Sequence, residues 1–122
     1  MRGIERARRE LTAAGLLVEH GFSEPAVSRS YYAAFYAAES ALSLLGESRA
    51  QHSGVLSAFV QLVVGRHGLD PTSGRLLRRL YTFRREADDS FDAVPDETAR
   101  AAVADATRVV DAVARWVDGR SR

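Results

Sequence analysis

Several arginines within residues 74–90 have types and a spacing that could bind phosphate groups. On a helical wheel Arg78, Arg79 and Arg85 fall close together, and each guanidinium can hold a phosphate through two parallel hydrogen bonds. We interpret them as candidate nucleic-acid or nucleotide ligands. The alternative is a solvated helix face whose charges are paired with acidic neighbours, and the spacing alone leaves both interpretations open.

Histidines and carboxylates give further candidates. His52 lies at an expected helix start in the run QHSG, where an imidazole could cap the helix or line a cleft. No histidine has a second histidine three or four positions away, so a helical metal site is not indicated. Asp88 and Asp89 have no identifiable third metal ligand and could simply form an arginine–carboxylate network. We therefore expect no metal ion and no cofactor.

The composition excludes several classes of chemistry. The 122-residue chain contains no cysteine, which excludes disulfides, thiol nucleophiles and thiolate zinc sites. All 17 basic residues are arginine, so Schiff-base and P-loop lysines are excluded too. A formal net charge of +1 argues against a constitutive nucleic-acid coat but allows a local arginine patch. The apolar runs are too short for a membrane span and no secretory signal is visible, so we expect a cytoplasmic protein.

The elements that must position these side chains are predicted to be helices. Alanine is abundant, β-branched residues do not alternate, and apolar residues recur every three or four positions. Glycine and proline divide the chain into five helical segments, at about 3–20, 23–45, 53–67, 74–90 and 96–118. The sequence therefore predicts one all-α domain over residues 1–122, an up-and-down bundle of about five helices.

Capping and turn signals mark the ends of these segments. Ser23 and Asp96 are predicted N-caps of the second and fifth segments. Gly119 is expected to end the fifth. The links at 70–74 and 90–95 contain the serine, aspartate, proline or glycine residues that are typical of turns and loops.

The second segment presents two kinds of surface. Its apolar stripe includes Tyr31 and Phe35, whereas Tyr32 and Tyr36 lie off that stripe. Its alanine-rich centre would let a neighbouring helix approach closely. We expect the spare aromatic and alanine-rich faces to bury an interface with a second copy of the chain, which makes a homodimer.

Three motifs in register resemble those of the HEPN domain family (higher eukaryotes and prokaryotes nucleotide-binding). Residues 28–39, SRSYYAAFYAAE, look like the signature second helix of that family. Residues 52–59, HSGVLSAF, resemble its third helix, and residues 80–88, LYTFRREAD, resemble its fourth. The order, spacing and number of helices agree over nearly the whole chain.

This resemblance implies a helical up-and-down bundle that is usually dimeric. Many prokaryotic members resemble toxins encoded beside a small nucleotidyltransferase-like antitoxin. Active members are metal-independent RNA endonucleases that use an arginine followed, after four to six residues, by a histidine near the dimer interface. In that mechanism the histidine acts as acid and base near the RNA 2′-hydroxyl, and the arginine holds the phosphate.

Arg84 matches the motif arginine, and the sequence departs from the pattern after it. Residues 89–91, where the histidine is expected, read DSF. Asp88, Arg29 and His52 also match motif positions, so we take Arg84 and Asp88 as candidate catalytic residues, with Arg29 and His52 as candidate RNA or nucleotide ligands. Because buried arginines must be paired, Arg29, Arg84 and Asp88 could instead form a structural network.

Two functional hypotheses follow. The first is the toxin-like component of a HEPN and nucleotidyltransferase toxin–antitoxin type system, acting on or binding RNA. The second is a non-catalytic nucleotide-binding or protein-interaction module in which the arginine and aspartate motif is structural. The absent histidine favours the second hypothesis on chemical grounds, whereas the usual role of the family members that the chain resembles favours the first.

Overall fold

The computed structural model describes residues 2–89 and 93–120. Helices make up nearly all of this part of the chain, and it contains no strand, so the all-α prediction is confirmed. The elements are α1 (Arg2–Glu19), α2 (Ser23–Leu44), α3 (His52–Ala58), η1 (Phe59–Arg66), α4 (Pro71–Asp89) and α5 (Asp96–Arg120). The expected third helix is thus α3 continued by the π-helical turns of η1, in which backbone N–H groups reach five residues back.

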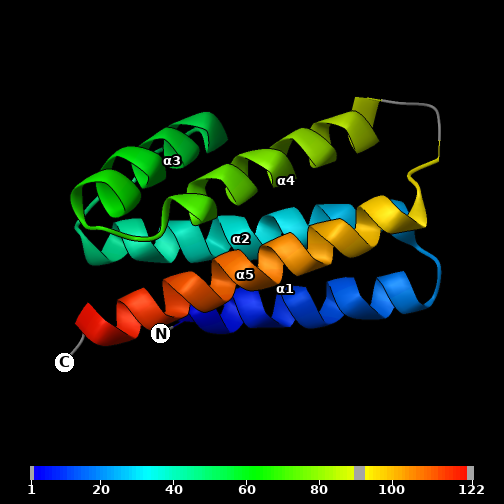
Figure 1. Ribbon diagram of the computed structural model, residues 1–122, viewed down its shortest axis with the longest axis horizontal. Coiled ribbons are helices and arrows are strands. Elements are labelled where there is room, and N and C mark those ends of the chain that lie inside the picture. Colours follow the sequence, from blue (N-terminus) through cyan, green and yellow to red (C-terminus); the bar gives the residue numbers. More distant parts are fainter. Residues whose placement is uncertain (1, 90–92, 121–122) are drawn as a thin grey trace.

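Helix α2 lies at the centre and contacts every other element. Figure 1 shows α1, α2 and α5 lying side by side, with α4 and the α3–η1 unit packed on one side of them. The chain reverses direction between α1 and α2 and again between α4 and α5 (Figure 1), which is the predicted up-and-down arrangement. No helix among the described residues is long and apolar enough to cross a membrane.

Small side chains let α2 and α5 approach closely across the bundle. Ala37, Ala38 and Ala41 of α2 and Ala102 and Ala106 of α5 have no exposed surface. Because an alanine surface holds two helix axes closer than larger side chains would, these two helices occupy the centre of the bundle. The alanine-rich face of α2 is therefore used inside one chain and is not free for a second copy, contrary to that part of the sequence prediction.

Helix α4 begins earlier than predicted. The segment 70–74 was expected to be a turn, but the helix starts at Pro71. The Asp70 carboxylate accepts a hydrogen bond from the Thr72 backbone N–H at 2.9 Å, which is the geometry of an N-cap followed by proline in the first turn. This backbone hydrogen bond lowers the pKa of Asp70 below its ordinary value. The early start adds the turn that places Gly74 against Val60 of η1.

Ser23 and Asp96, the two predicted N-caps, are instead the first residues of their helices. Ser23 lies inside the first turn of α2, whose N-cap is Phe22, and its hydroxyl donates to the Asp96 carboxylate at 2.6 Å. Asp96 lies at the start of α5, so the two side chains connect the starts of two helices that are far apart in sequence. Helix α5 also continues through Gly119 to Arg120. Of the expected loop at 90–95, residues 90–92 lie outside the described residues.

Candidate phosphate-binding site

A cluster of aromatic rings brings α2, α3 and α4 together. Tyr31 has no exposed surface and lies at its centre. Its ring centroid is 5.2 Å from that of Tyr32, 5.7 Å from Phe35 and 5.9 Å from Tyr81 of α4. Offset and edge-to-face contacts of this kind add to the free energy of burial. The cluster therefore forms a rigid floor on which polar groups can be placed.

His52 is held against this floor at the start of α3. Its Nδ1 lies 3.0 Å from the Tyr31 hydroxyl, and its ring centroid is 4.2 Å from that of Phe35. Helix α3 has no side-chain cap, so the capping role considered for His52 is not what the structure contains. The His52 side chain is partly exposed, and the Tyr31 contact is its only hydrogen bond among the described residues.

The Tyr31–His52 hydrogen bond is geometrically compatible with both tautomers of the imidazole, and we infer that Tyr31 is the donor. Burial raises the pKa of Tyr31 far above its ordinary value, even though the nearby Arg84 charge opposes this. The hydroxyl therefore remains protonated, and His52 Nδ1 is the acceptor within its reach. We assign the proton of neutral His52 to Nε2, so His52 offers an N–H donor toward solvent.

Arg84 lies over the same aromatic floor. Its guanidinium carbon is 5.2 Å from the ring centroid of Tyr31 and 5.0 Å from that of Tyr32. Arg84 Nε is buried and has no hydrogen-bond partner among the described residues, and the Asp88 carboxylate oxygen lies 3.7 Å away. The Arg84 side chain is 25% exposed and that of Asp88 is 53% exposed, so the pair meets solvent at its outer edge.

Arg29 also lies against the aromatic cluster. Its guanidinium carbon is 5.2 Å from the centroid of Tyr32, so Tyr32 carries both Arg29 and Arg84. Arg29 donates to Glu10 of α1 at 3.0 Å. The sequence left open a structural network in which Asp88 neutralises both Arg29 and Arg84. In the structure Arg29 is paired with Glu10, and only Arg84 lies near Asp88. Glu10 gave no signal in the sequence, because its role depends on how α1 is rotated against α2.

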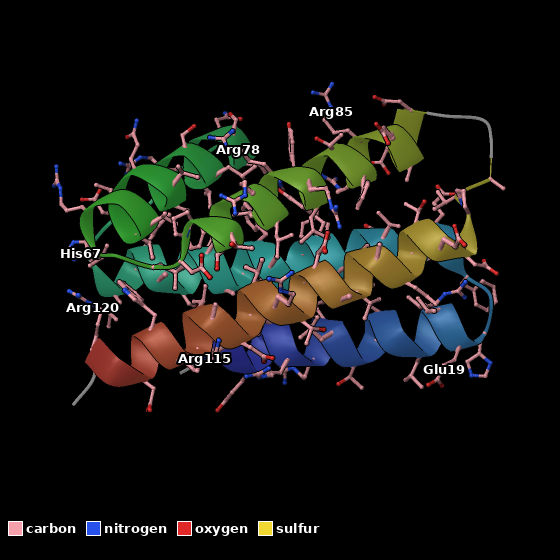
Figure 2. The ribbon with its side chains drawn as sticks, viewed as in Figure 1. Glu19, His67, Arg78, Arg85, Arg115 and Arg120 are labelled. Atoms are coloured by element: carbon pink, nitrogen blue, oxygen red, sulfur yellow. The ribbon has the colours of Figure 1, made fainter. Side chains whose placement is uncertain are left out.

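The three other candidate arginines of α4 do not share one surface. Arg79 makes two hydrogen bonds, of 2.8 and 3.0 Å, with the buried carboxylate of Asp105 on α5. Arg78 and Arg85 are exposed, and Figure 2 shows both on the outer side of α4. Arg79 is therefore already paired with a carboxylate, unlike the exposed Arg78 and Arg85. Asp105 was missed, although an aspartate on the apolar side of a helix is a signal for a buried ion pair.

The arrangement suits an anion. Arg29, Arg84 and the N–H of His52 surround the Tyr31–Tyr32 pair, and Glu10 and Asp88 offset only part of their charge. A phosphate oxygen is the acceptor that a buried guanidinium N–H without a partner would bind most strongly. Among the described residues no group of three side chains could hold a metal ion.

Comparison with known proteins gives a consistent result. The sequence model of the family described as HEPN domain matches residues 2–116. A Methanocaldococcus jannaschii protein named "Putative toxin" is 31% identical over 110 residues, which cover 90% of this chain and 82% of the relative. A second protein of that organism with the same kind of name is 33% identical over 90 residues, covering 74% and 60% of the two chains. A Thermotoga maritima "UPF0332 protein" is 36% identical over 83 residues, covering 68% and 63%.

Proposed function

Since this chain belongs to the HEPN domain family, we propose that it is a toxin-like member that acts on RNA through the phosphate site around Arg84. The names of the two Methanocaldococcus jannaschii relatives support the toxin-like role. The observation that carries the proposal is the buried Nε of Arg84. It has no hydrogen-bond partner in the part of the chain that the structure describes, and it lies 3.7 Å from the Asp88 carboxylate. A purely structural arginine would be expected to have this donor satisfied.

The proposed chemistry assigns one role to each group. Arg84 binds a non-bridging oxygen of the phosphate and stabilises the negative charge that develops on it. Asp88, one turn further along α4, accepts the proton of the RNA 2′-hydroxyl. The 2′-oxygen then forms a bond to phosphorus, the bond from phosphorus to the 5′-oxygen breaks, and water protonates that oxygen. Every step is independent of a metal ion.

A binding function without cleavage is the second candidate. It is favoured by the lack of a histidine base of the kind that active family members use, since on the tautomer that we assign His52 has no free acceptor nitrogen. Residues 89–91 also supply no histidine. On this alternative Arg84 and Arg29 hold a nucleotide phosphate, or the site is an interaction surface, and no bond is broken.

Partners and location follow from the same proposal. We expect a homodimer, because the members of the family that this chain resembles are usually dimeric. We also expect a nucleotidyltransferase-like antitoxin partner and action in the cytoplasm. Light scattering at micromolar concentration tests the dimer, and a monomeric mass would contradict it.

The deciding experiment is incubation of the purified protein with structured RNA in the presence of a metal chelator. The comparison uses wild type, Arg84→Ala, Asp88→Asn and the control Arg75→Ala, which removes an exposed arginine from the second turn of the same helix. Cleavage by wild type and the control but not by Arg84→Ala supports the nuclease. Binding that depends on Arg84 without cleavage supports the second candidate, and equal binding by all variants overturns the phosphate site.

A further inference from the structure

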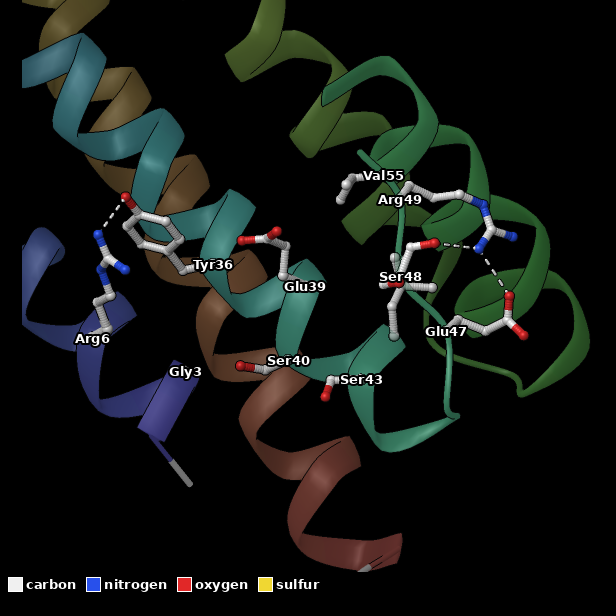
Figure 3. Close-up of a pocket in the computed structure, with 11 residues that line it drawn as sticks. Gly3, Arg6, Tyr36, Glu39, Ser40, Ser43, Glu47, Ser48, Arg49 and Val55 are labelled. Carbon is white, nitrogen blue, oxygen red and sulfur yellow. Dashed lines mark hydrogen bonds and ion pairs between the residues drawn. The ribbon is translucent and has the colours of Figure 1, made fainter. Parts of the chain in front are cut away.

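A pocket lies beside the phosphate site. It has a volume of about 430 Å³ and is formed by the start of α1, the second half of α2 and the link from α2 to α3. Pockets that bind small molecules begin at about 300 Å³. Figure 3 shows its lining, which includes Arg6, Tyr36, Glu39, Ser40, Ser43 and Arg49.

A row of rings and guanidiniums joins this pocket to Arg84. Tyr36 lines the pocket, and its ring centroid is 5.8 Å from that of Tyr32, which lies under Arg84 and Arg29. At the pocket end, the Arg6 guanidinium lies 4.0 Å from the Tyr36 centroid and donates to the Tyr36 hydroxyl at 2.9 Å. Alternating aromatic and cationic groups of this kind form platforms for single-stranded nucleic acids.

The planar guanidinium of Arg6 offers a flat surface for stacking. Its two contacts with Tyr36 hold the guanidinium in place, so its outer side can stack on a base without further ordering. Gly3 makes this placement possible, because a Cβ at that position would collide with the Ser40 hydroxyl. With any other residue at this position, the Ser40 hydroxyl would have to rotate away to keep α1 this close to α2.

Glu39 is an acidic residue of this pocket. It is exposed, lies on the pocket wall one turn after Tyr36, and has no hydrogen bond or ion pair among the described residues. The other acidic residue of the pocket, Glu47, is already paired with Arg49 at 2.9 Å (Figure 3). A carboxylate offers two adjacent acceptors, and among the RNA bases guanine presents two adjacent N–H donors on its Watson–Crick edge.

We propose that this pocket binds a guanine base of the RNA strand whose neighbouring phosphate is held by Arg84. Arg6 stacks on the base and Glu39 accepts its two N–H donors. The inference rests on the proposed function, because it assigns a base preference to the same RNA. The base pocket and the phosphate site are nevertheless separate sets of side chains, so each can be removed alone.

The first test uses guanosine 5′-monophosphate as the probe and the backbone amide signals of Gly3, Ser40 and Ser43 in NMR spectra as the readout. We expect saturable shifts in wild type and in Arg84→Ala, and about tenfold weaker binding in Glu39→Gln. Adenosine 5′-monophosphate should bind about tenfold more weakly than the guanine nucleotide. Equal shifts with both nucleotides, or unchanged binding by Glu39→Gln, would overturn the pocket.

The second test separates this inference from the function on which it rests. Short single-stranded RNAs that differ by one guanine-to-adenine change are titrated against wild type, Glu39→Gln, Arg84→Ala and the control Glu24→Gln, an exposed glutamate in the first turn of α2. We expect Glu39→Gln to lose only the base preference and Arg84→Ala to lose affinity for every RNA. Wild type that binds RNA through Arg84 without a guanine preference would overturn the pocket and leave the proposed function standing.

Discussion

The hydroxyl of Tyr31, at the centre of α2, lies 3.0 Å from Nδ1 of His52, the first residue of α3 and 21 positions further along the chain. This bond connects a fully buried tyrosine to a partly exposed histidine. It explains why His52 acts as a hydrogen-bond donor in the proposed site. Four predictions follow from this and related contacts.

The first prediction concerns the tautomer of His52. We expect nitrogen NMR at pH 8 to place the proton of neutral His52 on Nε2, because Nδ1 accepts the Tyr31 hydroxyl. Tyr31→Phe removes that donor and should give a mixture of tautomers. The exposed His20 is the reference histidine in the same spectrum. A wild-type His52 that carries its proton mainly on Nδ1 would contradict the assignment.

The second prediction concerns stability in alkaline solution. Burial raises the pKa of Tyr31, so the folded chain keeps this proton above pH 10.0, the ordinary value, while the unfolded chain loses it. The stability that this group contributes is present below that pH and declines as the pH rises through it. We expect the stability advantage of wild type over Tyr31→Phe to fall by about 1 kcal/mol between pH 9 and pH 11 in urea unfolding. A constant difference would show that the Tyr31 proton is not held by the fold.

The third prediction contrasts two arginines of α4. Arg79→Met leaves the Asp105 carboxylate, which is 7% exposed, without its two hydrogen bonds and should cost about 2 kcal/mol. Arg84→Met removes a guanidinium with an unsatisfied Nε and should change stability by less than about 1 kcal/mol, while reducing RNA binding. Urea unfolding measures both, and a loss at Arg84 as large as that at Arg79 would indicate a structural role.

The fourth prediction concerns the contact between α2 and α5. Ala102→Leu places extra volume where no surface is exposed and should cost about 3 kcal/mol, because the two helices must move apart. The matched control is Ala104→Leu, an exposed position on the same helix, which should change stability by less than about 0.5 kcal/mol. Thermal unfolding of both variants checks this, and similar midpoints would contradict the close packing.

Much of the fold could be predicted because its causes are local. A stripe of apolar residues every three or four positions is a property of one segment, and the stripe residues Tyr31 and Phe35 are buried as expected. The start of α4 was missed although its signal is also local. Asp70 followed by Pro71 is an N-cap and first-turn pair, and it was interpreted as a turn because both residues are common in turns as well.

The sequence by itself therefore determined the helices, their buried faces and the family motifs that contain Arg84 and His52. Only the tertiary structure decided which polar groups meet: Ser23 with Asp96, Arg29 with Glu10, and Tyr31 with His52. The physical reason is that helical periodicity fixes the face on which a side chain lies but not the rotation and axial shift of one helix against another. A hydrogen bond requires its two heavy atoms within about 3 Å of each other, so its partner is set by that packing.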